Sequence, residues 1–422
     1  MFQTVRSVSA LVAGATVLQI GTGLFGTFLA VRMDFEGFAD LTIGGVGSAY
    51  FAGFILGAIL AQIPVRRVGH IRSFAALAAV MCGTTLIYAL VVHPLAWVVF
   101  RFMNGLALSG LFVIAESWLN ERADNESRGR VFSLYMIANY AALGGSQFLL
   151  PLYPVDGAEV FILVAIFYAA ALLPVALSPT AAPQPYAGAR LSLLQLYRIS
   201  PLGVIGCVVC GLVNSAFYAL TPVFVLDVGL DAAAVSQFMG VAILAGLVLQ
   251  WPLGKLSDVF DRRTILVCIA ITSTALSVGI ALIDAERLWL LLLLALGYGG
   301  AAFTIYGIAV AHANDHLDPG QMVPASAGLL IAYGIGAVAG PTIGAAAMEI
   351  AGTAGLFGYI AAGFGLLAVF ALVRMRLRPP VPKAERVPYL SVPRTSPVVG
   401  ELDPRAEPAA ADDGQQSART AP

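Results

Sequence analysis

Ionic charge in this chain is confined to short breaks between long apolar runs. The best-formed break, Gly254-Lys-Leu-Ser-Asp-Val-Phe-Asp-Arg-Arg263, separates two runs that carry almost no charge. A charged side chain is expensive inside a lipid bilayer and costs little at its surface. A soluble domain would spread its charges along the faces of its helices. The pattern therefore predicts a polytopic membrane protein.

Composition agrees with this interpretation. Of 422 residues, 59% are hydrophobic and 11% are charged, and the mean hydropathy is +0.87. Soluble domains carry about 25% charged residues. We expect the lipid bilayer and a small-molecule solute as partners, and no nucleic acid.

Clusters of glycine, proline and charge divide the chain into twelve apolar segments, each near the ~20 residues that one crossing needs. The predicted fold is all-α and integral to the membrane. We expect spans at 8–32, 42–63, 74–92, 95–119, 130–152, 158–177, 202–226, 233–253, 264–284, 287–311, 324–348 and 355–374.

The spans group into two six-helix halves. We expect an N-terminal half at 1–178, a cytoplasmic linker at 179–200 and a C-terminal half at 201–375. The remaining residues, 376–422, are rich in Pro, Ala, Asp, Arg and Ser without apolar periodicity. Such a composition predicts a disordered tail.

Arginines concentrate in alternate connections between the spans, beginning with the connection that holds Arg66, Arg67 and Arg72. The other set of connections holds only Arg32 and Arg287, both beside acidic residues. The positive-inside rule then places both termini in the cytoplasm. This requires an even number of spans.

The two halves also repeat each other. Arg67-Val-Gly-His-Ile-Arg72 follows the second span, and Asp258-Val-Phe-Asp-Arg-Arg263 follows the eighth. An Asn-acid pair closes both the fourth and the tenth span, at 120–121 and 314–315. Two repeated halves joined by a linker are typical of transporters that rock about a central site.

Three motifs in these positions resemble those of the major facilitator superfamily. Residues 254–263 are similar to its loop motif Gly-x-x-x-Asp-Arg-x-Gly-Arg-Arg, Arg101-Phe-Met-Asn-Gly105 to its Arg-x-x-Gln-Gly motif, and Gly336-x-x-x-Gly-Pro-x-x-Gly344 to its span-eleven motif. More narrowly, residues 116–121 and 312–315 resemble the bacterial YcaD-like branch. The resemblance implies a monomeric, cofactor-free transporter in the bacterial inner (plasma) membrane.

The chain departs from the superfamily pattern in two places. Gln62 and Arg66 stand in the first-half loop where Gly and Asp are usual. The fifth span lacks the proline that accompanies antiport in the superfamily. Antiport therefore does not follow from the resemblance.

The loop motif supplies the candidate cytoplasmic gate. The resemblance implies that Asp258 and Arg262, with Gly254 and Arg67, latch this face of the bundle through charge-assisted hydrogen bonds. The alternative is an ordinary charged turn that only obeys the topology.

Two charged residues inside the fourth span are candidates for proton coupling. Glu116 lies about one turn inside the cytoplasmic end of that span, where it could be neutral in apolar surroundings and ionised when wetted. It could instead pair with Arg66 or Arg67. Arg101 is functional by default because a membrane-embedded cation must be compensated, or it reaches the periplasmic surface.

Polar residues at helical spacing predict the faces that line the solute cavity, since the resemblance places spans one, four, seven and ten around it. Any one of them could instead make a hydrogen bond between helices. The candidates are Gln19, Thr22, Asn104, Asn214, Tyr218, Thr221, Tyr298 and Tyr306. We expect hinge or packing roles for Gly336, Gly340, Pro341 and Gly344.

No catalytic or metal-binding pattern is found. His312 and His316 have the spacing of a zinc motif, but Ala313 stands where a metalloprotease needs Glu. Cys207 and Cys210 have no second pair, so we interpret them as small residues on a membrane helix. The chain has no nucleophile elbow, P-loop or dinucleotide fingerprint, which argues against an enzyme.

These observations predict a secondary active transporter working by alternating access. A largely uncharged cavity suits a small neutral or amphipathic solute. We expect proton-coupled efflux of a drug or metabolite. The alternatives are uptake of a small metabolite by proton symport, and a membrane sensor that does not transport.

Overall fold

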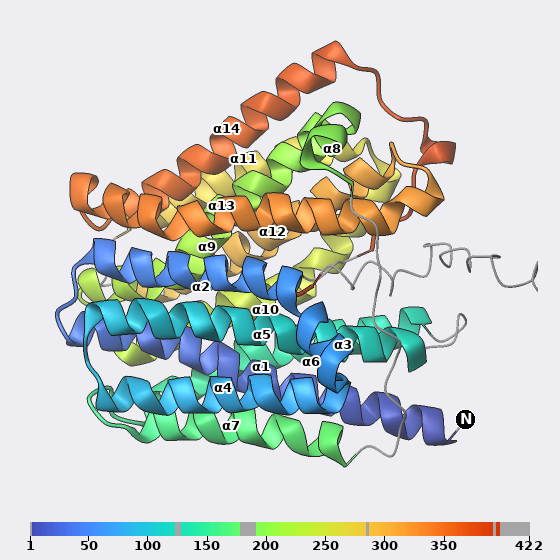
Figure 1. The fold of residues 1–422 in the computed structure, drawn as a ribbon. Coiled ribbons are helices and arrows are strands. Elements are labelled where there is room, and N and C mark those ends of the chain that lie inside the picture. The colour runs from blue at the N-terminus through green and yellow to red at the C-terminus, as the bar shows by residue number, and fades with distance from the viewer. Residues whose placement is uncertain (1, 123–127, 178–190, 284–286, 391–393, 397–422) are drawn as a thin grey trace, which may run out of the picture.

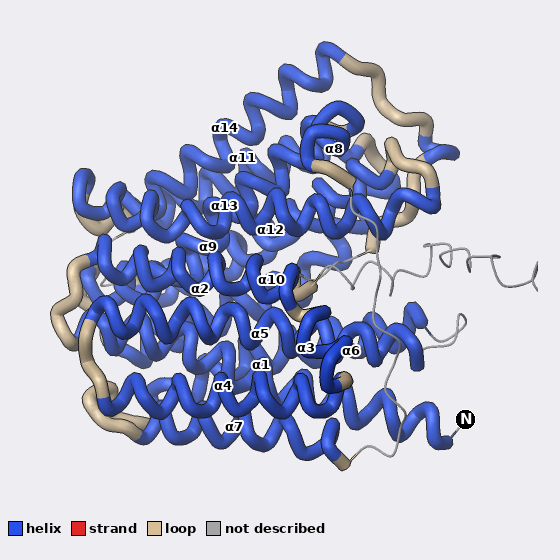
Figure 2. Tube along the Cα trace, viewed as in Figure 1, coloured by secondary structure: helices blue, strands red, loops and turns tan. Residues whose placement is uncertain are grey.

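The computed structural model describes residues 2–122, 128–177, 191–283, 287–390 and 394–396. These residues are mostly helical, and none of them belongs to a strand (Figures 1 and 2). The first half holds α1 (Phe2–Phe35), α2 (Asp40–Leu60), α3 (Gln62–Val68), α4 (His70–Leu90), α5 (Pro94–Arg122), α6 (Arg128–Gly145), η1 (Ser146–Leu152) and α7 (Glu159–Ala176). The second holds α8 (Leu193–Ile199), α9 (Pro201–Asp227), α10 (Ala232–Val259), α11 (Arg262–Ala281), α12 (Leu288–Asn314), η2 (Pro319–Gln321), α13 (Met322–Ala351), α14 (Gly355–Leu377) and η3 (Lys383–Glu385).

Eleven described helices are long and apolar enough to cross a bilayer. The remaining crossing is α6 continued by η1. Tyr135 of α6 bonds Glu116 near the last turn of α5, whereas Val155 beyond η1 accepts a hydrogen bond from Arg32 near the last turn of α1. Since those turns lie at opposite ends of the bundle, the segment traverses it. The all-α membrane fold with twelve crossings is confirmed.

The helix ends match the expected ends within a few residues, except at the start of α1, which begins at Phe2, and around the loop motif. There α10 continues to Val259, so only Phe260 and Asp261 separate it from α11. Asp261 caps α11 by accepting a hydrogen bond from the Arg263 amide at 3.0 Å. The motif is thus mostly helical rather than an open break.

The two halves pack by the same rule. In the first half Gly105 of α5 lies against the Tyr50 carbonyl of α2, and in the second Gly299 of α12 lies against the Ala242 carbonyl of α10. A glycine has no Cβ, so each helix pair can approach to backbone contact. The matching pairs are the structural counterpart of the repeat in the sequence.

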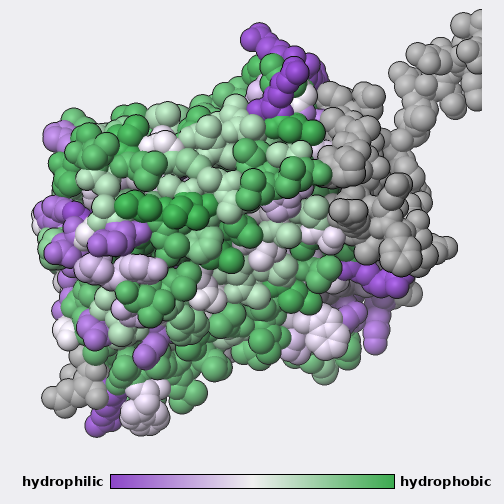
Figure 3. All heavy atoms as spheres, turned by 90° about the horizontal axis from the view of Figure 1, so that it is seen from below, coloured by the Kyte–Doolittle hydropathy of each residue, from purple (hydrophilic) through white to green (hydrophobic). Residues whose placement is uncertain are grey.

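In Figure 1 the first half lies below and the second half above, with most helices running across the view. We call the end where α1 begins and α14 ends the terminal end, and the opposite end the far end. Figure 3 shows an apolar band across the middle of one face with hydrophilic residues gathered toward its ends. Lipid-facing side chains in such a band include Leu173, Val248, Trp251, Leu293 and Leu366, all exposed.

The region expected as a linker, 179–200, contains the short helix α8, which a capping box at Ser192 begins. Residues 179–190 lie outside the described residues. The region expected to be a disordered tail also differs in its described part. The described residues 376–390 and 394–396 come after the spanning helices. Among them, the Tyr389 and Ser396 side chains are buried. We call residues 387–390 and 394–396 the docked tail.

Candidate functional site

A cavity of about 230 Å³ lies between the two halves. Its described lining comes from α1, α2, α5, α6, η1, α9, α10, α13 and the docked tail. Four of the residues expected from the sequence lie on it: Gln19, Thr22, Arg101 and Tyr218. Aromatic and aliphatic side chains form most of the remaining wall.

The far end of this cavity is closed by direct packing of the halves. Gly44 of α2 fits against Pro341 of α13. The Ser48 and Thr342 hydroxyls lie 2.7 Å apart, and Ser236 donates to the Gln147 carbonyl at 2.7 Å. Helix-to-helix contact therefore seals the far end.

Arg101 lies on the cavity wall between aromatic rings. Its guanidinium carbon is 4.4 Å from the Tyr50 ring centre and 5.3 Å from that of Phe25. Such cation–π contacts compensate a cation away from bulk water. Arg101 is half-buried, and it faces the interior of the first half and the cavity.

The remaining cavity candidates lie elsewhere. Asn104 is fully buried and donates to Thr84 at 2.6 Å, between α4 and α5. Tyr298 stacks on Phe217 at 5.0 Å inside the second half. Asn214 and Thr221 are likewise buried and absent from the cavity wall. In the described state none of these four residues lines the cavity, so their contact with a solute stays a prediction.

Tyr306 occupies a different position. It is buried in α12, and its ring lies 5.4 Å from that of Tyr333, which does line the cavity. It therefore stands directly behind the cavity wall, within reach of whatever lies against Tyr333.

The gate candidates of the second half form one ion-pair cluster. Arg262 is paired with Asp258 at 3.0 Å and with Asp315 at 3.0 Å. Burial raises the pKa of Asp315 to about 6, although the Arg262 guanidinium opposes this shift. At Asp261 burial is outweighed by hydrogen bonds from Arg263, which hold the pKa of that carboxyl below its usual value.

This cluster binds the docked tail rather than the other half. The Val387 amide donates to Asp315 at 2.9 Å, and the Tyr389 amide donates to Asp258 at 2.7 Å. Arg262 donates to the Val387 carbonyl. Arg67 of the first half is exposed and takes no part in this cluster.

Gly254 and Gly307 form the seat of the Tyr389 ring, which packs on both of them. A side chain at either position would occupy the space that the ring fills. The glycine that opens the loop motif is thus adapted to this ring.

Glu116 is the only fully buried acidic residue in the described spanning helices. It accepts a hydrogen bond from Tyr135 at 2.7 Å, and from the hydroxyls of Thr395 and Ser396. Pairing with Arg66 or Arg67, one of the two expectations, is not seen among the described residues. The carboxylate oxygens instead accept hydrogen bonds from Tyr135 and from the docked tail. Donated hydrogen bonds and burial make Glu116 a group whose charge depends on what covers it.

The glycines of α13 pack against a neighbouring helix. Gly336 lies on the Val208 carbonyl and Gly340 on the Leu212 carbonyl, both in α9, and Gly344 faces Ala216 of the same helix. Pro341 contacts α2 from the other half. This stretch therefore joins α13 to both α9 and α2.

The described residues offer no group of three or more His, Cys, Asp or Glu side chains that could hold a metal ion. His316 instead bonds the His312 carbonyl at 2.9 Å. Burial lowers the pKa of His316.

The sequence does not predict the docked tail. Its composition predicts disorder for the region that contains Tyr389, Arg394, Thr395 and Ser396. The only available signal was a lone aromatic residue within a polar, proline-containing stretch, which is weak.

Comparison with known proteins gives a consistent result. The profile of the Major Facilitator Superfamily matches residues 11–323 and 252–399. An uncharacterized MFS-type transporter of Enterobacter sp. strain 638 is 28% identical over 349 residues, covering 82% of this chain and 89% of the relative. The uncharacterized MFS-type transporter YcaD of Escherichia fergusonii is 27% identical over 350 residues, with the same coverage.

Solved structures share the fold at low sequence identity. The crystal structure of the nucleoside transporter NupG matches with a TM-score of 0.76 at 16% identity, covering 88% of this chain and 100% of that one. A bacterial homolog of the human lysosomal transporter Spinster, in an inward-facing and occupied conformation, matches with a TM-score of 0.70 at 14% identity, covering 90% and 97%.

Proposed function

The chain belongs to the major facilitator superfamily, and from this premise we propose that it exports a small solute in exchange for protons. The family match makes it a multi-pass inner-membrane transporter rather than an enzyme. The observation that carries the proposal is the cavity between the two halves, which helix packing closes at the far end and which Arg394 and Thr395 of the docked tail line among the described residues.

Alternating access follows from that arrangement. Two repeated halves that meet at one end can rock until they meet at the other. The arginine distribution supports a cytoplasmic terminal end, so the described state would face the cytoplasm. We propose that the protein works as a monomer, since each chain holds a complete cavity.

The cluster of Asp258 and Arg262 is proposed to latch the terminal end when it closes. In the described state Asp258 and Arg262 hold each other and the docked tail. Arg67, exposed on the first half, would face this cluster when the halves approach. Gly254, whose missing side chain makes room for the Tyr389 ring in the described state, is proposed to take part in the same latch.

Glu116 is proposed as the proton-coupling group. It is buried, carries no ion pair among the described residues, and is reached by hydroxyl groups from the tail. A carboxylate in such a place can exchange a proton for a solute when its covering changes. Arg101, which also lines the cavity, would contribute a positive electrostatic potential there and is the second proposed proton-coupling residue.

Gln19, Thr22 and Tyr218 are proposed solute contacts, because they are polar residues that line the cavity. Tyr306 would affect solute binding indirectly, by packing against Tyr333, which lines the cavity. The hinge would lie where α13 meets both α9 and α2, at Gly340 and Pro341.

The test uses proteoliposomes containing the full chain and trapped pyranine, screened with a panel of drugs and metabolites. For a solute that moves protons, Glu116→Gln should abolish pH-driven net flux while solute counterflow continues. Glu159→Gln, which neutralises an exposed acidic residue at the start of α7 outside the cavity lining, is the matched control that should keep proton movement. Unchanged pH-driven flux in Glu116→Gln would exclude the proposed role.

Direction is measured separately in everted membrane vesicles energised by respiration, whose interior becomes acidic. Export in exchange for protons predicts solute accumulation inside these vesicles. Accumulation only in right-side-out vesicles would replace export with uptake. Binding without flux in either preparation would indicate a sensor.

A further inference from the structure

The docked tail places one cation inside the cavity. Arg394 lines the cavity wall together with Tyr140, Tyr218 and Tyr333. It arrives from the C-terminal tail and not from any of the spanning helices. The chain therefore fills part of its own cavity with a guanidinium group.

This guanidinium is surrounded by aromatic rings. Its carbon lies 5.4 Å from the Tyr333 ring centre, 5.8 Å from that of Phe303 and 5.9 Å from that of Tyr306. From the other half, the Tyr140 hydroxyl lies 3.5 Å from an Arg394 nitrogen. We call Tyr140, Phe303, Tyr306 and Tyr333 the aromatic cage.

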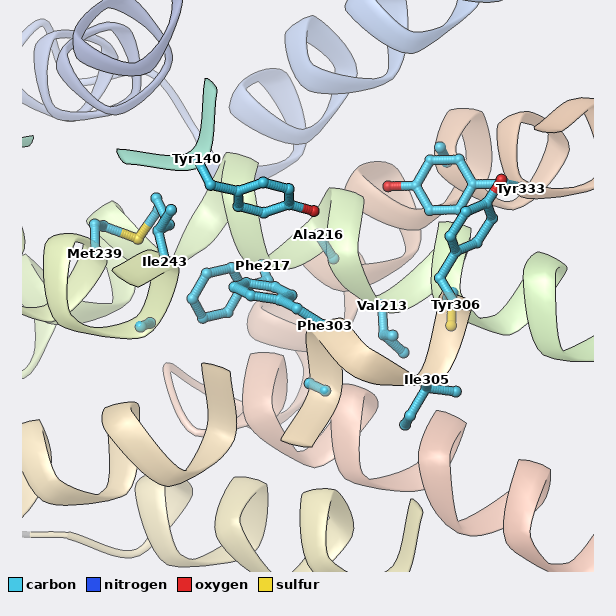
Figure 4. Packing of buried hydrophobic residues seen from close by; sticks show 14 of the residues in the cluster. Tyr140, Val213, Ala216, Phe217, Met239, Ile243, Phe303, Ile305, Tyr306 and Tyr333 are labelled. Carbon is cyan, nitrogen blue, oxygen red and sulfur yellow. The ribbon is translucent and has the colours of Figure 1, made fainter. Parts of the chain in front are cut away.

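The cage residues belong to the spanning helices of the two halves. Figure 4 shows the Tyr140 ring of α6 pointing toward Tyr333, which lies beside Tyr306, and the Phe303 ring beside Phe217. All four residues belong to the buried core, and the Tyr306 and Tyr333 rings meet edge to face at 75°. The Phe303, Tyr306 and Tyr333 rings all lie within 6 Å of the guanidinium carbon, whereas Tyr140 contributes its hydroxyl.

No ion pair to Arg394 forms among the described residues. Aromatic faces of this kind attract guanidinium and ammonium groups through the ring quadrupole, and the attraction grows where water is excluded. A neutral occupant of the same shape would gain the hydrophobic and dispersion contacts but not this electrostatic attraction. The cage therefore favours positive charge.

The residues that follow Arg394 in the docked tail reach a buried carboxylate. Thr395 and Ser396 bond Glu116, so the carboxylate lies beside the backbone that carries the guanidinium. The three tail residues thus join the aromatic cage to the buried carboxylate. A free ligand with a cationic head and neighbouring hydrogen-bond donors could make the same contacts.

We propose that the aromatic cage, together with Glu116, is a binding site for small organic cations bearing a guanidinium or alkylammonium group. Arg394 occupies this site in the described state and competes with such a ligand. The inference rests on the proposed function, since a transporter binds its solute in the central cavity.

The test is equilibrium binding to the full chain in detergent micelles by titration calorimetry. The probes are phenethylguanidine and its neutral isostere phenethylurea, which differ in charge but hardly in shape. Arg394→Ala should bind phenethylguanidine at least tenfold more tightly than the wild type, because its competitor is gone. Phenethylurea should gain no more than twofold.

A second series tests the cage itself in the Arg394→Ala background. Tyr333→Leu should weaken phenethylguanidine binding at least tenfold, whereas Tyr333→Phe, which keeps the ring, should retain it within about threefold. Lys383→Ala, made in the wild-type chain, removes an exposed positive charge of the C-terminal region outside the cavity and should bind phenethylguanidine as the wild type does. The Phe variant and the thermal unfolding midpoint separate loss of the site from loss of the fold.

Two results would overturn the proposal: Arg394→Ala binding phenethylguanidine no more tightly than the wild type, or binding the urea equally well. Binding in micelles needs no proton gradient. Its failure would therefore leave the Glu116 coupling experiment untouched, and failure of that experiment would leave the cation site standing.

Discussion

Replacing Tyr389 by alanine should release the docked tail from its seat. The Tyr389 side chain is 6% exposed and packs on Gly254 and Gly307. Burying an aromatic side chain of this kind contributes about 2–3 kcal/mol. Because every ~1.4 kcal/mol is a factor of ten, the undocked population should rise about 30-fold to 150-fold.

Hydrogen exchange followed by mass spectrometry measures this population directly. The Val387 and Tyr389 amides are bonded to Asp315 and Asp258, so they exchange only when the tail leaves. Exchange through rare opening scales with the open population. The peptide covering these amides should therefore exchange faster by the same factor in Tyr389→Ala.

Tyr389→Phe provides the matched control, since it keeps the ring that fills the seat. Its exchange should stay within about threefold of the wild type. Equal protection in Tyr389→Ala and the wild type would show that the ring does not hold the tail, and the packing argument would be wrong.

Three further predictions concern packing, titration and the far-end contact. Gly336→Val should lower the unfolding free energy by about 1–3 kcal/mol, because its side chain would meet the backbone of α9; thermal unfolding checks this against Gly358→Ala, whose added Cβ meets no atom within 4 Å. Because burial raises the pKa of Asp315 to about 6, this carboxyl binds its proton more tightly when folded, so its stabilisation is complete below the ordinary value of about 3.9 and is lost as the pH rises through 6. The unfolding midpoint of Asp315→Asn should therefore fall less than that of the wild type between pH 4 and pH 6, and parallel profiles would contradict this. Oxidation of the Ser48→Cys, Thr342→Cys double variant should stop flux by locking the far end, and dithiothreitol should restore it; flux that survives complete cross-linking would refute closure at this contact.

The membrane topology could be predicted from the sequence because the penalty for charge in lipid acts on each segment separately. The sequence places the charged residues Asp261, Arg262 and Arg263 outside the hydrocarbon core of the bilayer, whatever the packing of the helices. The helix ends were less certain. Lys255 to Val259 read as a break, but α10 continues through them because a helix can extend beyond the bilayer into water.

Which polar residues meet the cavity could not be predicted from spacing alone. Helical periodicity places Asn104 on one face of its helix, but it does not say whether α4 or open space lies opposite. Thr22 and Tyr218 have the same kind of periodicity and do reach the cavity. The difference depends on contacts between segments distant in sequence.

The docked tail was missed for the same reason. Its composition cannot support a fold of its own, and this remains true. Its order comes from a seat built by α10 and α12, more than 70 residues upstream at Asp315. Local composition carries no information about such a seat.

The way the ion-pair cluster holds the tail has a consequence for sequence divergence. Asp258 and Asp315 grip main-chain amides, and Arg262 grips a main-chain carbonyl, so side-chain identity at Val387 and Pro388 is of little importance to them. Spacing matters instead, because the two amides must stay two positions apart. Relatives could carry other side chains at these positions. A single insertion between Val387 and Tyr389, however, would break the match between the docked tail and the ion-pair cluster.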